Sequence, residues 1–153
     1  VDLDIFGLIN SFEANYADRI SAPAVLVLGG EQFTKVIMTL NGSLVDFEVF
    51  KFKPDTRDAA SYAEAVQRSV RRLVAAHARM TVKGVPPLYL AGMIFSWEKF
   101  SDECLKSLGD VRLMNPFRNI GCTAFPETSI RAYGPRLSVA VGLAVRESGE
   151  VGS

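Results

Sequence analysis

Alternating hydrophobic and polar positions in the first third of the chain predict three consecutive β-strands. Residues 24–28 form a continuous apolar run, typical of a strand that is covered on both faces. A second strand is predicted over residues 32–40, and the turn Gly29-Gly30-Glu31 separates the two. Asn41-Gly42 predicts a tight hairpin into a third strand over residues 43–52, because both residues tolerate a positive φ angle.

The third strand of this meander has the clearest alternation. It places Asp46 and Glu48 on one face, and on the other face it places Val45, Phe47 and Val49. Three strands with one hydrophobic face are not stable alone in water. The rest of the chain is therefore expected to cover them.

Apolar residues spaced three or four positions apart predict four helices around the meander. Their expected extents are residues 1–16, 58–80, 96–108 and 137–146. Asp2 or Asp4, Asp58 and Ser96 are the expected N-caps of the first three. Gly109 is expected to end the third helix in the left-handed conformation.

Two short strands, over residues 88–91 and 111–114, complete the predicted elements. Residues 117–136 read as irregular apart from one helical turn after Pro126, and residues 147–153 as a frayed tail. Helix, three strands, and then alternating helices and strands predict an α/β fold with a mixed sheet and helices on both faces. This is the layout of an RNase H-like half domain, the unit of actin-like ATPases. We expect a linking helix at 1–16 and one domain at 23–146.

The composition excludes several classes of protein. Of 153 residues, 17 are basic and 17 acidic, which argues against a chain-wide attraction to nucleic acid. Two cysteines, Cys104 and Cys122, make neither a disulfide framework nor a zinc cluster, and we expect reduced thiols. No apolar run approaches the ~20 residues that span a bilayer. The chain begins without a signal peptide or an initiator Met, as a fragment of a longer protein would.

Each candidate for chemistry also has a structural explanation. His77 is the only histidine, and a mechanism pairing it with Asp46 or Glu48 is one hypothesis; a hydrogen-bonded histidine at the core boundary is favoured. Cys104 lies on an apolar stripe, where thiols are inert. A solvated helix face is favoured over an anion or nucleic-acid site for the arginines at positions 68, 71, 72 and 79. No catalytic group and no metal-ligand spacing stands out.

The Gly29-Gly30 turn lies where actin-like ATPases bind phosphate, but bulky side chains follow it, and a structural turn is the favoured interpretation. The aromatic residues Phe95, Trp97 and Phe100 follow the fourth strand, where a nucleotide cleft would open. They are expected to pack in the core, with a partner contact as the alternative.

Four segments resemble the second half of the PilM family, the cytoplasmic actin-like component of type IV pilus assembly. These are DLDIFGLINSFEANY, the meander with its glycine turn, VRLMNPFRNI and YGPRLSVAVGLAVRE. The family carries an Asp in its second phosphate turn and a run of glycines in its adenosine loop. Here Val27 stands at the Asp, and only Gly29, Gly30, Thr34 and Gly92 remain as vestiges of these loops. Met93, Ile94 and Phe95 are expected to block the nucleotide.

The resemblance therefore implies a non-enzymatic scaffold with no cofactor, in the cytoplasm and peripheral to the bacterial inner membrane. Its partners would be pilus-assembly proteins similar to PilN, bound through the full-length protein. The residues expected near a junction with the family's first half are Phe6, Ile9, Ala140 and Ala144. The alternative is an actin-like ATPase of the cell-division (FtsA-like) or type II secretion type, which binds and hydrolyses ATP with Mg²⁺.

Overall fold

The computed structural model describes residues 3–52, 58–119 and 127–151. The helices are α1 (Leu3–Asn15), α2 (Ala59–Ala76), α3 (Glu98–Ser107) and α4 (Glu127–Val151), with a short 3₁₀ helix, η2 (Met93–Ser96). The strands are β1 (Ala24–Gly29), β2 (Phe33–Leu40), β3 (Ser43–Lys51), β4 (Leu88–Ala91) and β5 (Val111–Leu113). The order of elements predicted from the sequence is confirmed.

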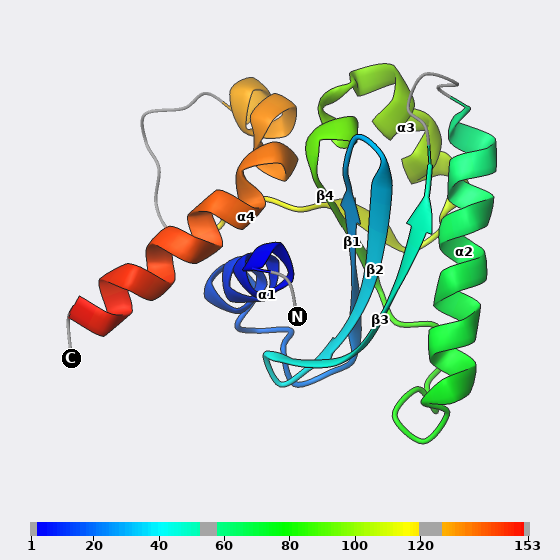
Figure 1. The fold of residues 1–153 in the computed structure, drawn as a ribbon, viewed down its shortest axis with the longest axis horizontal. Helices are drawn as coiled ribbons and strands as arrows, with labels where there is room; N and C mark the ends of the chain where they lie inside the picture. Colours follow the sequence, from blue (N-terminus) through cyan, green and yellow to red (C-terminus); the bar gives the residue numbers. More distant parts are fainter. Residues whose placement is uncertain (1–2, 53–57, 120–126, 152–153) are drawn as a thin grey trace.

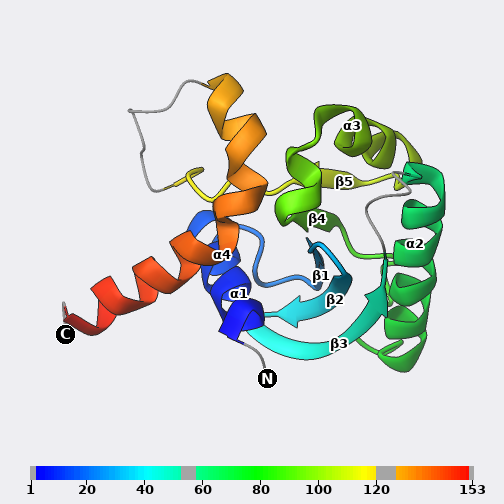
Figure 2. The ribbon, with the colours of Figure 1, turned by 45° about the horizontal axis from the view of Figure 1, so that its top comes forward.

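One five-stranded sheet has the order β3-β2-β1-β4-β5. The strands β1, β2 and β3 are antiparallel neighbours, whereas β4 runs parallel to both β1 and β5. Helices α2 and α3 cover one face of the sheet, and α1 and α4 lie on the other (Figures 1 and 2). The predicted α/β architecture with a mixed sheet and helices on both faces is therefore confirmed.

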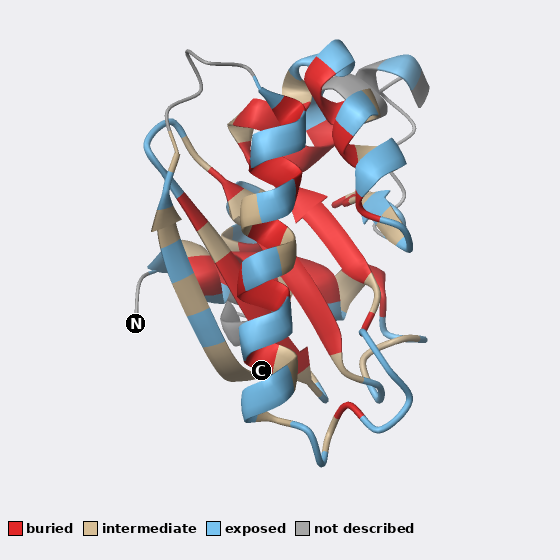
Figure 3. Cartoon of the chain, turned by 90° about the vertical axis from the view of Figure 1, so that its right-hand side faces the viewer, coloured by how far each residue is buried: buried red, intermediate tan, exposed pale blue. Residues whose placement is uncertain are grey.

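The core has two parts, one on each side of the sheet. Val25, Val27 and Leu90 face α2 and α3, whereas Leu26, Ile37 and Tyr89 face α1. The central strands are buried on both faces, as the continuous apolar run predicted (Figure 3). The edge strand β3 is only partly covered.

The predicted faces of β3 are confirmed for Asp46, Glu48, Phe47 and Val49, and wrong only for Val45. Met38 pairs with Asp46 and Thr39 with Leu44, so Val45 is an extra residue at a β-bulge. The bulge places Val45 on the face that α2 covers, together with Asp46 and Glu48, whereas Phe47 and Val49 lie exposed on the α1 side. Period-2 alternation cannot reveal an inserted residue, because the pattern remains regular on either side of it.

Four helix boundaries also differ from the prediction. Helix α2 ends at Ala76 rather than near residue 80, and Trp97, not Ser96, is the N-cap of α3. Helix α4 begins at Glu127, ten residues before the predicted start, and continues through the expected tail to Val151. It contains Pro135, a residue that bends helices, and α4 is bent in Figure 1.

Three other local signals, one turn and two helix ends, are confirmed. Asn41 and Gly42 have φ angles of 53° and 72°, as the hairpin requires, and Gly109 follows α3 with φ 78°. The Asp58 carboxylate accepts the Ser61 N–H at 3.1 Å and the Ser61 hydroxyl at 2.7 Å, which caps α2. The proposed cap Asp2 and the thiol of Cys122 lie outside the described residues.

Candidate functional site

The two glycine turns meet at the carboxyl ends of the parallel strands β1 and β4, where α/β proteins bind ligands. Gly92 has φ 106° and ψ 170°, a conformation open essentially only to glycine. A Cβ on Gly92 would lie 2.3 Å from the Gly29 carbonyl oxygen and 2.8 Å from the Gly29 nitrogen. The two backbones are therefore in direct contact.

Ile94 fills the remaining space beside Gly29. A Cβ on Gly29 would lie 2.5 Å from both Cδ1 and Cγ1 of Ile94. Ile94 and Phe95 are fully buried, and Phe100 is 6% exposed, so these aromatic and aliphatic residues pack in the core. Trp97, with 36% of its surface exposed, lies at the edge of this cluster.

Polar groups around the two turns are bonded within the chain. The Gly30 N–H donates to the Phe33 carbonyl at 3.0 Å, and the Gly92 N–H donates to the Pro135 carbonyl of α4 at 2.8 Å. The Thr34 hydroxyl is buried and hydrogen-bonded to the Tyr62 hydroxyl at 3.0 Å. Burial raises the pKa of Tyr62, so its hydroxyl stays neutral in this position.

Beside the β1–β2 turn, on the α1 side of the sheet, lies an open hollow of about 520 Å³. Its walls include Leu28, Phe33 and Val49, with Glu31 at its rim. The Lys35 ammonium and the Asp4 carboxylate, which also line it, are paired at 2.7 Å. The hollow therefore has an apolar floor and few unpaired charges.

The structure brings His77 and Asp46 together, as the catalytic hypothesis required. The ring Nε2 of His77 lies 2.9 Å from Asp46 Oδ2, and Arg72 pairs with Glu48 at 3.0 Å. Both pairs join α2 to the edge strand, and the His77 and Asp46 side chains are 27% and 43% exposed. This position matches the boundary histidine favoured from the sequence, and the pairs act as clamps between α2 and β3.

We expect Asp46→Asn to lower stability in a pH-dependent way. The His77 hydrogen bond, helped by the Phe47 N–H, holds the pKa of Asp46 below its ordinary value. A carboxylate with a lowered folded-state pKa stabilises above its unfolded pKa, and loses this effect as the pH falls through the folded one. The variant should lose about 0.5 kcal/mol of unfolding free energy at about pH 6, and the difference should shrink below about pH 4.

Urea denaturation at several pH values measures this effect. Asp110→Asn, at an exposed carboxylate on another part of the surface, is the control, and its difference should be much smaller. Equal losses in both variants at every pH would mean that the His77–Asp46 pair contributes nothing.

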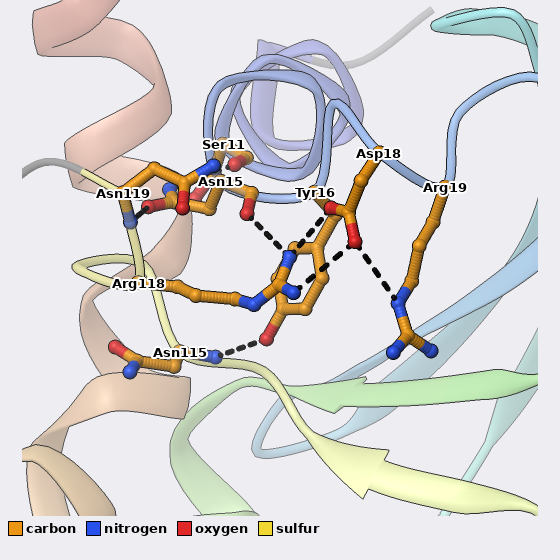
Figure 4. Close-up of polar contacts among 8 residues, drawn as sticks. All are labelled: Ser11, Asn15, Tyr16, Asp18, Arg19, Asn115, Arg118 and Asn119. Carbon is orange, nitrogen blue, oxygen red and sulfur yellow. Dashed lines mark hydrogen bonds and ion pairs between the residues drawn. The ribbon is translucent and has the colours of Figure 1, made fainter.

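A polar cluster ties the segment after β5 to the end of α1 (Figure 4). The Tyr16 hydroxyl accepts the Asn115 N–H at 3.0 Å, and Asn15 Oδ1 accepts the Asn119 N–H at 3.0 Å. Arg118 donates to the Asn15 carbonyl and to Asp18, and its guanidinium lies 4.8 Å from the Tyr16 ring centroid. The Asn-Pro-Phe-Arg-Asn segment therefore holds the C-terminal end of α1 in place.

The four residues expected at a junction have different surroundings. Ile9 is 4% exposed and packs in the core of this chain, whereas Phe6 is 40% exposed. Ala140 and Ala144 lie on the exposed side of α4. Close helix packing through small residues is seen between α4 and α1, where a Cβ on Gly142 would lie 1.6 Å from the Gly7 carbonyl oxygen.

The other candidates are accounted for by packing and solvation. Cys104 is buried, and burial raises its pKa to about 12, so its thiol is unreactive at neutral pH. Arg68 and Arg71 are exposed on α2 and Arg79 is exposed in the turn after it, as a solvated surface predicts. Within residues 3–52, 58–119 and 127–151, no three His, Cys, Asp or Glu side chains gather where they could hold a metal ion. No helix in these ranges is long and apolar enough to cross a membrane.

Sequence reasoning missed three parts of this region: Tyr62, the Pro135 carbonyl and the polar cluster around Arg118. Each comes from an element far from the glycine turns or from α1 in the sequence. The Asn-Pro-Phe-Arg-Asn segment carried the only signal that could have pointed to one of them, since it stands out in the family resemblance.

The mixed sheet with helices on both faces matches solved structures with the actin-like ATPase fold. Three of the structures that match cover nearly the whole length of this chain. A PilM-PilN type IV pilus biogenesis complex matches 95% of the chain with a TM-score of 0.62 and 18% identity.

The other two structures are more distant in sequence. A protein with an actin-like ATPase fold and unknown function from Bacteroides thetaiotaomicron matches 92% of the chain (TM-score 0.54, 12% identity). The ethanolamine utilization protein EutJ from Carboxydothermus hydrogenoformans matches 93% (TM-score 0.51, 14% identity). The chain spans about half of these structures, with 52%, 44% and 53% of their lengths covered. No protein-family model and no curated protein matches the sequence.

Proposed function

We propose that this chain is a non-enzymatic scaffold domain of the PilM type, in which the actin-like nucleotide site is closed. The observation that carries the proposal is the direct contact between the Gly29 and Gly92 backbones, with Ile94 packed against them. In this fold a nucleotide must lie close to the backbone of both turns. Here the backbones of the two turns contact each other, so they leave no space between them for a nucleotide.

The donor groups support the same conclusion. Backbone N–H groups that cradle a phosphate must be free to donate to it. The N–H groups of Gly30 and Gly92 already donate to Phe33 and Pro135, and the Thr34 hydroxyl is bonded to Tyr62. Val27 occupies the position of the family's Asp, so the turn also lacks a carboxylate for hydrated Mg²⁺. These residues do not fit Mg-ATP.

A scaffold role follows from what the domain retains. Its fold, its closely packed α1–α4 pair and the exposed Phe6, Ala140 and Ala144 beside that pair suit a domain held against other protein parts. The matched PilM structure is a complex with PilN, and we propose a PilN-like partner for the full-length form of this protein. As part of this proposal, the protein acts on the cytoplasmic side of a bacterial inner membrane.

A thermal-shift titration with Mg-ATP tests the proposal against the alternative of an active ATPase. A site at about a hundred times its dissociation constant gains about 2.7 kcal/mol. For a chain of this size, that gain raises Tm by about 5 to 10 °C. We expect a change below about 1 °C at about 5 mM Mg-ATP, relative to magnesium chloride alone. A saturable, magnesium-dependent rise of several degrees would favour the ATPase.

A further inference from the structure

The α1-side face of β2 and β3 carries an exposed apolar patch, which we call the sheet-face patch: Phe33, Phe47 and Val49. These side chains are 49%, 37% and 47% exposed. Val49 lies opposite Lys35 and Phe47 opposite Ile37, so both share the face that α1 covers further along the sheet. Phe33 and Val49 also line the 520 Å³ hollow beside the β1–β2 turn. Apolar side chains gathered around a hollow mark a contact surface.

The patch is suited to face packing and not to the addition of a strand. β3 is the edge of the sheet, where an incoming strand would pair with its outer backbone groups. The N–H of Phe47 is not available for this, because it donates to the Asp46 carboxylate at 2.8 Å. Asp46 is itself held by His77. Because this backbone donor of β3 is already hydrogen-bonded, packing on the exposed face of the sheet is favoured over pairing with the edge.

The charges at the rim of the patch indicate what the partner presents. Glu31, in the β1–β2 turn, lies on the β1 side of Phe33, and Lys51 of β3 lies opposite Phe33 on the other side. The Lys51 ammonium is 6.0 Å from the Phe33 ring centroid. The remaining charges in the hollow, Asp4 and Lys35, neutralise each other. The patch therefore has an apolar centre with one acid and one base on opposite flanks.

We infer that a second copy of this chain packs on the sheet-face patch around a two-fold axis. A two-fold interface must be self-complementary, and an acid and a base on opposite flanks meet this requirement. The rotation brings Glu31 of each copy to Lys51 of the other, while Phe33 and Val49 of the two copies pack together. If the charged residues at the rim were all acidic or all basic, the partner would have to be a different protein that carries the opposite charge. This inference does not depend on whether nucleotide binds.

Sedimentation equilibrium of the full chain, from about 5 to about 500 µM, tests the inference through a charge swap. The native chain should show a reversible monomer–dimer equilibrium. Glu31→Lys and Lys51→Glu should each raise the dissociation constant by about threefold to tenfold, because each places like charges together at both ends of the interface. The double variant should return the constant to within about twofold of the native value.

Val49→Asp tests the apolar centre and should leave a monomer at every concentration. Val82→Asp is the matched control, because Val82 is 79% exposed on the loop after α2, and it should leave the dimer unchanged. Circular dichroism melting confirms that each variant is folded. A native chain that stays monomeric throughout, and so leaves the patch to another protein, overturns the inference. So does a dimer that Val49→Asp does not weaken, or one that the double charge swap does not restore.

Discussion

Gly142→Ala should destabilise the protein by about 3 kcal/mol, a fall in Tm of about 6 to 12 °C. The added Cβ would lie 1.6 Å from the Gly7 carbonyl oxygen and 2.8 Å from the Ser11 nitrogen, both backbone atoms of α1. Backbone atoms cannot rotate away as a side chain can, so α1 and α4 must separate. The gain in helix propensity, about 1 kcal/mol, offsets only part of this cost.

The same crossing provides a graded control. A Cβ on Gly7 would meet the Val139 carbonyl oxygen at 2.9 Å and side-chain atoms of Leu143 and Val139 at 3.0 Å. Gly7→Ala should therefore cost less than Gly142→Ala, because the side chains can move. Ala140→Ser, on the exposed side of α4, should change Tm by less than about 2 °C. A Gly142→Ala protein as stable as the Ala140→Ser protein would show that the two helices are not closely packed.

Gly92→Ala is expected to have an effect of similar size, about 3 kcal/mol or more, for two reasons. Its backbone angles are strained for any residue with a Cβ, and that Cβ would lie 2.3 Å from the Gly29 carbonyl oxygen. Denaturation in urea measures the loss. Gly84→Ala is the control, because Gly84 also has a positive φ, 102°, but a Cβ there would meet nothing within 4 Å. Comparing Gly84→Ala with Gly92→Ala separates the cost of backbone strain from the cost of the clash between the two turns.

A double-variant test locates the cause more closely. Gly29→Ala brings its Cβ against the side chain of Ile94, so its cost should fall markedly in a protein that also carries Ile94→Ala. Gly92→Ala clashes with backbone, so Ile94→Ala should not relieve it. If Ile94→Ala relieved both substitutions equally, Ile94 would not be the side chain that fills the space beside Gly29.

The sequence predicts the fold well wherever its signals are local. The Asn41-Gly42 hairpin, the Asp58 cap and the left-handed Gly109 each depend on the chemistry of one or two neighbouring residues. The apolar runs at 24–28 and 88–91 give the central strands because both faces of these strands are buried. The layers then follow from the order of helices and strands.

The errors occur where distant contacts override local preference. The bulge at Val45 is fixed by the pairing with β2, and it places Val45 on the face of Asp46 and not, as predicted, on the face of Phe47. Residues 117–136 were predicted to be mostly irregular, yet α4 begins at Glu127 and continues through Pro135, because the helix is held against η2 and its Pro135 carbonyl accepts the Gly92 N–H. Neither contact has a signature in the residues nearby.

The sequence drew attention to Gly29, Gly92 and the bulky residues after them, because a phosphate-binding turn has a recognisable pattern and these residues depart from it. The sequence could not show that the two turns contact each other. Nor could it show that Tyr62 is hydrogen-bonded to Thr34, or that the Pro135 carbonyl accepts the Gly92 N–H. These partners come from α2 and α4, and only the folded chain brings them to the ends of β1 and β4.

The most direct test of the closed site follows the backbone amides of Gly29, Gly30 and Gly92 by ¹⁵N NMR while Mg-ATP is added. The account predicts that these three resonances stay within the small, uniform changes produced by matched ionic strength. Saturable shifts centred on these glycines, lost when magnesium is removed, would show that the turns open to hold a nucleotide.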